Sequence, residues 1–198
     1  MKFLFDLGGV FFDWDPKHFF KDIFETTEEM NFFLTKVCND DWNSFQDAGR
    51  SFEEAERIIS NEFPQYTKQI KMYYLNHRKM IKGTYKNSIE ILKKLKKNSY
   101  ECYVLSNWSS ETFKGMMEEY KFLKLFEGII ISGNEKIIKP DPEIYKIAIK
   151  RFKLEPKNSL FIDDKLINIS AAEKLGFKTL HLTDPKTIYE DIEKCLSK

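Results

Sequence analysis

Phe3–Gly9, with the sequence Phe-Leu-Phe-Asp-Leu-Gly-Gly, joins a short apolar run to one carboxylate and a pair of glycines. A brief, nearly unbroken apolar run that ends at glycines predicts a strand covered on both faces. Asp6 then follows the strand directly, at the start of a loop. Ligands of an open parallel sheet bind beyond the carboxyl ends of its strands. Asp6 is therefore a candidate for chemistry.

Three further short segments end a predicted strand or open a loop with a polar side chain. They supply the hydroxyl of Ser106, the amine of Lys139 and the paired carboxylates of Asp163 and Asp164. If their strands are neighbours, these groups converge with Asp6 on one pocket. Carboxylate, hydroxyl, lysine and paired carboxylates are the groups that metal-assisted phosphoryl transfer needs.

The rest of the sequence repeats an alternation of strand and helix. Apolar runs at 2–5, 101–105, 128–131, 159–162 and 178–182 predict five strands, and helical patterns at 85–97, 110–120, 142–152 and 168–175 lie between most of them. This alternation predicts an α/β fold with a doubly wound, mainly parallel, Rossmann-like sheet.

Residues 14–83 interrupt that rhythm, since they show four helical stretches and no convincing strand. The first begins at Asp15 and Pro16, the second and third begin at the capping boxes of Thr26 and Ser51, and the fourth runs over 65–81. We therefore predict a core formed by residues 1–13 and 84–198 and a small helical cap formed by residues 14–83.

The composition limits the partners and the compartment. A net charge of +1 over 198 residues gives no bulk attraction to nucleic acid or to a membrane surface, so neither is expected as a partner. No apolar run approaches the ~18 residues of a membrane span. Cys38, Cys102 and Cys195 are widely spaced and odd in number, which favours reduced thiols and a cytoplasmic location. The pattern gives no prediction of oligomeric state.

Three carboxylates in one pocket need positive charge. A buried group of Asp6, Asp163 and Asp164 with no cation would be very costly. Lys139 supplies one charge, and a divalent cation would supply the rest. Hard oxygen ligands favour Mg²⁺ over zinc.

The order and spacing of these motifs resemble the haloacid dehalogenase (HAD) superfamily, subfamily I, with a helical cap of the C1 type inserted after the first motif. Phe-Asp-Leu-Gly-Gly-Val at 5–10, Leu-Ser-Asn-Trp-Ser at 105–109 and Ile-Asp-Asp at 162–164 resemble glucose-1-phosphatase-like sugar-phosphate phosphatases. The resemblance implies a HAD-type phosphatase, a phosphoric monoester hydrolase. Its expected partner is a small phosphorylated metabolite, such as a sugar or polyol phosphate.

The resemblance also implies a metal site and a nucleophile. Asp6 would attack phosphorus and form an aspartyl-phosphate, which water then hydrolyses. Mg²⁺ would be held by Asp6, the backbone carbonyl of Gly8 and the acidic pair. Within that pair, Asp164 is expected to be the direct ligand, with Asp163 acting at close range or through water.

The remaining implied roles concern the phosphoryl group. The hydroxyl of Ser106 and the amide of Asn107 would hold phosphoryl oxygens. Lys139 would screen the charge of Asp6 from that of the phosphate and would complete the catalytic pair with Asp6.

Gly8 departs from the pattern of most HAD phosphatases, which carry a second aspartate at this position as general acid. General acids contribute about 10²–10⁴ in rate. The proton for the leaving group then has to come from water, from the substrate, or from a nearby acid such as Asp13, Asp15 or Asp47, and the sequence does not choose among them.

Substrate contacts are expected at two places in the cap. Trp14 lies at the junction where the chain leaves the core, and residues 41–47, which include Trp42, lie between predicted cap helices. Most other cap aromatics have helical spacing and are predicted to form the cap's own core. His18 and His77 are interpreted as cap residues without metal-ligand spacing.

Two alternatives remain open. A metal-independent 2-haloacid dehalogenase uses the same nucleophilic aspartate and also lacks the second acid, but Asp163 and Asp164 argue against it because they build a cation site. A non-catalytic phosphate-binding protein of the same fold is supported by Gly8 alone.

Overall fold

The computed structural model describes residues 1–197, and five strands form its central sheet. They are β1 (Lys2–Phe5), β4 (Cys102–Ser106), β5 (Gly128–Ile131), β6 (Ser159–Asp163) and β7 (Lys178–His181), in the order β5-β4-β1-β6-β7. Every pairing is parallel. The predicted α/β fold and mainly parallel sheet are confirmed, with strand ends within about one residue of the expected ones.

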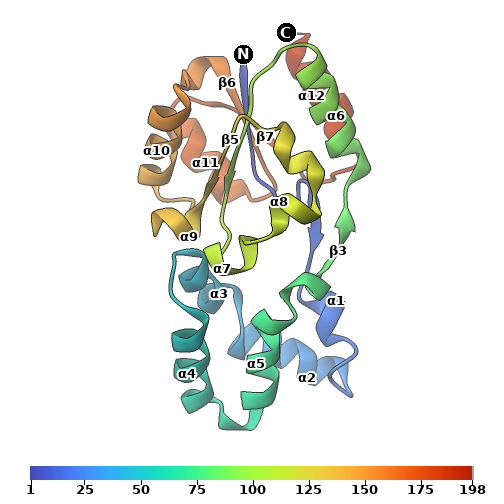
Figure 1. Cartoon of the computed structure of the whole chain (residues 1–198), viewed down its shortest axis with the longest axis vertical. Coiled ribbons are helices and arrows are strands. Elements are labelled where there is room, and N and C mark those ends of the chain that lie inside the picture. The colour runs from blue at the N-terminus through green and yellow to red at the C-terminus, as the bar shows by residue number, and fades with distance from the viewer. Residues whose placement is uncertain (198) are drawn as a thin grey trace.

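Helices cover both faces of this sheet (Figure 1). α6 (Lys86–Lys97) and α12 (Ile188–Leu196) lie on one side, and α10 (Pro142–Phe152) and α11 (Leu166–Lys174) lie on the other. The central strands β4, β1 and β6 are mostly apolar because both of their faces are covered, whereas the edge strand β7 is only partly buried.

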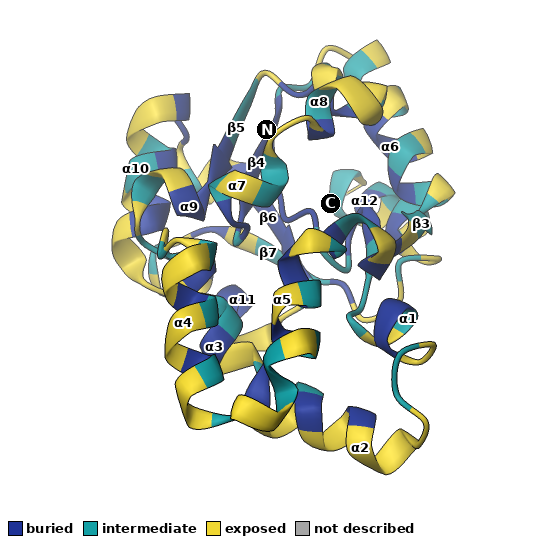
Figure 2. Ribbon diagram, turned by 60° about the horizontal axis from the view of Figure 1, so that its bottom comes forward, coloured by how far each residue is buried: buried dark blue, intermediate teal, exposed yellow. Residues whose placement is uncertain are grey.

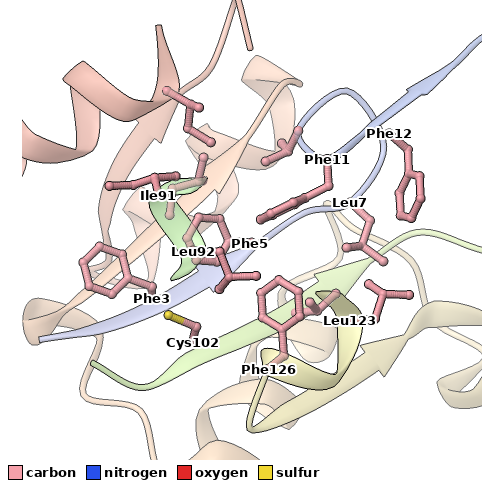
Figure 3. Packing of buried hydrophobic residues seen from close by; sticks show 14 of the residues in the cluster. Phe3, Phe5, Leu7, Phe11, Phe12, Ile91, Leu92, Cys102, Leu123 and Phe126 are labelled. Carbon is pink, nitrogen blue, oxygen red and sulfur yellow. The ribbon is translucent and has the colours of Figure 1, made fainter. Parts of the chain in front are cut away.

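Aromatic side chains dominate one of the two core layers. Phe5 packs edge to face against Phe11 and Phe126, with ring centroids 5.5 Å and 6.0 Å away. Figure 3 shows these rings meeting the apolar face of α6 through Ile91 and Leu92. Burial of such side chains stabilises the fold by ~1.5–3 kcal/mol each. This packing holds β1 rigidly, and with it the start of the loop at Asp6.

A second group of helices lies below the sheet in Figure 1 and has its own core. Its elements are α1 (Lys17–Phe20), α2 (Thr27–Phe32), the π-helix η1 (Phe33–Val37), α3 (Asp40–Asp47), α4 (Phe52–Glu62), the 3₁₀ turn η2 (Pro64–Tyr66), α5 (Thr67–Leu75) and the 3₁₀ turn η3 (His77–Met80). Phe20, Phe33 and Tyr73 form the centre of this core, while the outward surfaces of the helices are exposed (Figure 2).

The prediction that residues 14–83 contain no strand is wrong. β2 (Phe12–Trp14) and β3 (Ile81–Thr84) form an antiparallel ribbon where the chain enters and leaves the helical group. Each of these strands is too short to show a periodic pattern of apolar residues, and the partner strand lies about seventy residues away in the sequence. For the same reason the helix expected over 65–81 ends at Leu75, followed by η3. The predicted boundaries at 13/14 and 83/84 fall inside this ribbon.

The remaining elements refine the prediction. The helix expected over 110–120 is two short helices, α7 (Ser110–Phe113) and α8 (Met116–Glu119), because Gly115 between them has a φ of +84°. α9 (Ser132–Glu135), η4 (Lys121–Leu125), η5 (Pro156–Asn158) and α12 had no predicted counterpart. Within residues 1–197, no helix is long and apolar enough to cross a membrane.

Candidate active site

Asp6 lies just past the end of β1, and three donors hold its carboxylate. The amide of Leu7 and the hydroxyl of Ser106 donate to Oδ1 at 2.7 Å and 2.6 Å, and Nζ of Lys139 lies 3.1 Å from Oδ2. Ser106 reaches Asp6 because β4 pairs directly with β1. Burial raises the pKa of Asp6 to about 7, against the opposing charge of Lys139.

Lys139 is a fully buried cation between two carboxylates. Its Nζ donates to Oδ2 of Asp163 at 2.6 Å and lies 3.1 Å from Asp6. Burial alone would lower the pKa of Lys139, but the charges of Asp163 and Asp6 outweigh it and the pKa is raised. The amine is therefore positively charged.

Asn107 holds the backbone of Lys139 from the loop after β4. Its side-chain oxygen accepts from the Lys139 amide at 2.8 Å, and its side-chain nitrogen donates to the Lys139 carbonyl at 2.9 Å. This reciprocal pair positions the lysine relative to Ser106. The side chain of Asn107 thus has a positioning contact that the sequence did not indicate.

Asp163 ends β6, and its two oxygens are occupied by protein donors. Oδ1 accepts from the Lys165 amide at 2.8 Å and from Nδ2 of Asn168 at 3.0 Å. Oδ2 accepts from Lys139 at 2.6 Å and from Asn168 at 3.1 Å. The carboxylate is fully buried, so these contacts compensate its desolvation.

Asp164 is the more accessible member of the acidic pair. It is half-buried, and burial together with the charge of Asp163 raises its pKa. Gly9 approaches it closely, because a Cβ built on Gly9 would lie 2.5 Å from Oδ2 of Asp164. Gly9 also has a φ of +67°, a conformation that favours glycine. The second glycine of the opening motif therefore makes room for this carboxylate.

The three carboxylates of Asp6, Asp163 and Asp164 form a group that fits a cation. Each offers an oxygen, and the three oxygens lie within 4.8 Å of one another. Lys139 is the one buried amine found between them in residues 1–197, so negative charge exceeds positive charge. Carboxylate oxygens at this density suit Mg²⁺.

A cavity of about 430 Å³ opens above these groups and is bounded on its other side by the helical cap. Six of the predicted site residues line it: Asp6, Gly8, Trp14, Asn107, Lys139 and Asp164. Ser106 and Asp163 lie directly behind, fully buried, and contact Asp6 and Lys139. Residues from opposite ends of the chain thus lie together, as expected for residues that follow the carboxyl ends of neighbouring parallel strands.

Trp42 is placed differently from the prediction. Its ring lies in the cap core, with centroids 5.2 Å from Tyr73 and 5.3 Å from Tyr74. Among the described residues it is not part of the cavity lining, although Asp41 and Asn43 are. Residues 40–47 form α3, in which successive side chains point about 100° apart around the helix axis. Trp42 therefore points into the core of the helical group, while Asp41 and Asn43 point to the cavity. We propose no substrate contact for Trp42.

The cavity also contains aromatic residues that sequence reasoning missed. Tyr74, His77 and Trp108 line it together with Trp14. The buried Nε1 of Trp14 and Nδ1 of His77 have no hydrogen-bond partner within residues 1–197. Helical spacing made Tyr74 and His77 look like cap core, and only docking of the cap on the core turns them toward the site. Trp108 belongs to the second motif, two residues after Ser106, and this position was the one sequence signal that it lies near the site.

Comparisons with known proteins agree with this geometry. The sesquiterpene phosphatase astK of Aspergillus oryzae is 26% identical over 181 residues, covering 91% of this chain and 89% of that protein. A HAD family enzyme of Bacteroides thetaiotaomicron, solved with magnesium and inorganic phosphate, has a TM-score of 0.67 at 27% identity over 90% of this chain and 92% of its own. (S)-2-haloacid dehalogenase 4A of Burkholderia cepacia is 28% identical over 79 residues, which is 40% of this chain and 34% of the dehalogenase.

The family assignment follows from the length of the match. Residues 4–182 fit the sequence pattern of one family. That span contains the sheet except Lys2 and Phe3, the second group of helices, and Asp6, Ser106, Lys139, Asp163 and Asp164. The chain belongs to the haloacid dehalogenase-like hydrolases.

Proposed function

We propose that this chain is a Mg²⁺-dependent phosphohydrolase that acts on a small phosphomonoester through an aspartyl-phosphate on Asp6. The observation that carries the proposal is the placement of Asp6 at the floor of the cavity, between a buried ammonium and a second accessible carboxylate. Lys139 lies 3.1 Å from Asp6, and Asp164 offers an oxygen within 4.8 Å of it. Phosphoryl transfer needs a nucleophile, a fixed positive charge and an accessible carboxylate that can hold a metal ion.

The carboxylate of Asp6 is prepared to act as the nucleophile. The two donors on Oδ1, from Leu7 and Ser106, fix the plane of the group before substrate binds. Preorganisation of this kind removes reorientation from the barrier. Lys139 offsets the repulsion between the attacking carboxylate and the phosphate dianion. Ser106 and the amide of Asn107 are proposed to hold phosphoryl oxygens once substrate enters.

Mg²⁺ would be held by Asp6, by the carbonyl of Gly8 and by Asp164, and it supplies charge neutralisation of the phosphoryl oxygens when bound. Asp164 is proposed as the direct carboxylate ligand of the acidic pair because it lines the cavity. Asp163 is proposed to act at close range, since its oxygens accept four hydrogen bonds from Lys139, Lys165 and Asn168.

The substrate is proposed to be a sugar or polyol phosphate. A cavity of about 430 Å³ holds a small metabolite, and its aromatic walls suit the faces of a sugar ring. Trp14 and His77 line this cavity, and their buried Nε1 and Nδ1 have no hydrogen-bond partner within residues 1–197. Burial lowers the pKa of His77 to about 4, so the ring is neutral and Nδ1 can donate or accept.

The relative named sesquiterpene phosphatase raises a second substrate class, an apolar phosphate ester. Trp108, Ile138 and Ile167 give one part of the cavity an apolar wall, which favours such a ligand. Hydrolysis of sugar phosphates, polyol phosphates and prenyl phosphates under the same conditions separates the two classes by their kcat/KM values.

A small phosphorylated metabolite fits this cavity. A net charge of +1 gives no bulk attraction to a nucleic acid. A cytoplasmic location is proposed with it, supported by the free thiols of Cys38, Cys102 and Cys195.

The experiment is phosphate release from a panel of monoesters, with wild type and Asp6→Asn, in Mg²⁺ and after exhaustive chelation. We expect turnover that requires both Mg²⁺ and Asp6, and an acid-stable mass increase of one phosphoryl group on Asp6 when turnover is quenched. Halide release from 2-chloropropionate that survives chelation would instead establish the dehalogenase alternative. Equal, negligible turnover by both proteins would favour a phosphate-binding role.

A further inference from the structure

The reaction proposed above leaves one step without a residue, and this inference rests on that proposed function. When the bond between phosphorus and the ester oxygen breaks, the departing alkoxide needs a proton. Gly8 occupies the position where a carboxylic acid would stand in the loop after β1 and offers no side chain. A general acid is worth about 10²–10⁴ in rate, so its source determines which esters the enzyme can cleave.

Few acids face the cavity. Asp13 is paired with His18 at 3.0 Å, and Asp15 accepts from the Lys17 amide at 2.8 Å at the start of α1. Neither lines the cavity among the residues that the structure describes. The carboxylates that do are Asp6, Asp40, Asp41, Asp47 and Asp164.

Asp47 differs from the other four carboxylates in its role and in its exposure. Asp6 and Asp164 already serve the nucleophilic attack and the proposed metal. Asp40 and Asp41 occupy the first turn of α3 and are exposed. Asp47 is the last residue of α3, is half-buried and lines the cavity.

The backbone of Asp47 is attached to the core. Its carbonyl accepts from the hydroxyl of Ser132 at 2.6 Å, and the same hydroxyl accepts from the Trp108 amide at 2.9 Å. Gly49, with a φ of +95°, brings the chain so close that a Cβ there would lie 3.0 Å from the carbonyl of Gly133. These contacts fix the end of α3 beside the loop that follows β4.

The side chain of Asp47 is oriented by a hydrogen-bond chain inside the cap. Nδ2 of Asn43 donates to Oδ2 of Asp47 at 3.0 Å, and the hydroxyl of Tyr74 donates to Oδ1 of Asn43 at 2.9 Å. Nε2 of Gln46 donates to the Tyr74 oxygen at 2.8 Å, and Nε of Arg50 donates to Oε1 of Gln46 at 2.6 Å. The bond from Asn43 to Oδ2 orients the carboxyl group of Asp47.

The environment of Asp47 favours the protonated form. Burial raises its pKa to about 7; the charge of Lys165 and the backbone amide of Ser109 act in the opposite direction, and Asp6 and Asp40 add to the rise. The titratable groups that line the cavity with it come from six segments: Asp40 and Asp41 of α3, Asp6 after β1, Tyr74 of α5, His77 of η3, Lys139 before α10, and Asp164 and Lys165 before α11. A catalytic acid works best when its pKa lies near the working pH.

We propose that Asp47 is the general acid–base residue of this enzyme, supplied by the cap in place of a side chain at position 8. As an oxygen of Asp6 forms its bond to phosphorus, the phosphorus–oxygen ester bond breaks and the proton of Asp47 passes to the ester oxygen, which departs as an alcohol. Asp47 is left as a carboxylate. It then takes a proton from the water that attacks the aspartyl-phosphate, which releases inorganic phosphate and returns both aspartates to their starting forms.

The test compares phosphate esters of graded leaving-group basicity. The comparison uses kcat/KM, which reports formation of the aspartyl-phosphate and not its later hydrolysis, a step common to all esters. Asp47→Asn should lower kcat/KM for alkyl phosphates by about 10²- to 10⁴-fold. The same variant should keep kcat/KM for p-nitrophenyl phosphate within about tenfold of wild type, because nitrophenolate leaves without a proton. Glu62→Gln, an exposed cap residue outside the cavity, serves as the matched control and should leave both rates unchanged. Equal losses on all esters, or no loss on alkyl esters, would overturn the proposal.

A rescue distinguishes chemistry from packing. A Cβ built on Gly8 meets no atom within 4 Å, so the backbone there accepts a side chain without a clash at Cβ. Gly8→Asp placed in the Asp47→Asn protein should raise hydrolysis of alkyl phosphates at least tenfold above Asp47→Asn alone. It should also restore a pH profile in which kcat falls as the catalytic acid loses its proton. If Gly8→Asp alone is active and the double variant shows no recovery, Asp47 does not supply the proton.

Failure of the proposed function looks different. If wild type and Asp6→Asn release phosphate from p-nitrophenyl phosphate at equal rates, the aspartyl-phosphate mechanism fails whatever Asp47 does. If hydrolysis depends on Asp6 but Asp47→Asn shows no selectivity between alkyl and aryl esters, only the role of Asp47 is lost.

Discussion

Replacement of Lys139 by methionine tests the electrostatic core of the site, because two ion pairs in this protein differ in burial but not in length. Nζ of Lys139 lies 2.6 Å from Asp163, with both side chains 0% exposed. Nζ of Lys146 lies 2.6 Å from Glu143, with both side chains 56% exposed. Methionine has a similar volume to lysine and removes the charge from either pair.

The expected costs differ greatly. Loss of one partner from a buried ion pair costs about 3–5 kcal/mol, because the remaining charge is left unpaired away from water. Lys139→Met leaves both Asp163 and Asp6 without their cation, so its free energy of unfolding should fall by at least that amount. An exposed pair three residues apart on a helix contributes about 0.2–0.5 kcal/mol. Lys146→Met should therefore stay within about 0.5 kcal/mol of wild type.

The assays are urea unfolding and thermal unfolding at neutral pH in chelator, so that no added cation replaces the ammonium. For a chain of 198 residues, each kcal/mol shifts Tm by about 2–4 °C, so Lys139→Met should unfold roughly 6–20 °C below wild type. Asp163→Asn added to Lys139→Met should recover part of the loss, since it removes one unpaired charge. Losses for Lys139→Met and Lys146→Met that agree within about 1 kcal/mol would refute the reasoning.

Three further predictions concern single positions around the cavity. Gly9→Ala should abolish the Mg²⁺-induced rise in Tm, because its Cβ would lie 2.5 Å from the Asp164 carboxylate, whereas Gly8→Ala, which meets nothing within 4 Å, should keep it; equal responses in thermal unfolding would contradict this. Asn107→Ala should lower the free energy of unfolding by about 1–3 kcal/mol in urea, because two hydrogen bonds to the Lys139 backbone are lost. Burial raises the pKa of Asp47 to about 7 in the folded protein, so its protonated form adds stability below about pH 4 that is lost as pH rises to about 7. The stability of Asp47→Asn relative to wild type should thus increase over that range, by roughly 1–2 kcal/mol for a half-buried group, and a flat difference curve from urea unfolding would count against the raised pKa.

The sheet and the floor of the site were predictable because they depend on local signals. The central strands β4, β1 and β6 are buried on both faces, so their apolar runs stand out from the amphipathic helices beside them. Once the strands are parallel, the residues after their carboxyl ends must meet at one edge. Asp6 and Ser106 meet there at 2.6 Å, although one hundred positions separate them.

The cap was less predictable because its placement depends on contacts across the chain. α3 did carry a local signal, with Asn39 as N-cap and two acids in the first turn. Without the helix, the side-chain directions of Trp42 and Asp47 could not be assigned. The bond from Ser132 to the carbonyl of Asp47 joins segments 85 positions apart, and no periodic pattern reports such a contact. The ribbon of β2 and β3 was not predicted for the same reason.

The location of the proposed acid has a consequence for the order of events. A carboxylic acid at position 8 would belong to the core and would face a bound ester whether or not the cap was in place. Asp47 belongs to α3, and its position depends on the Ser132 contact that holds α3 on the core. The proton is then available only when the cap sits over the cavity, where water is excluded and charges interact strongly. Leaving-group protonation and enclosure of the substrate would become one event, so an ester too large for the cap to cover would also lose its acid.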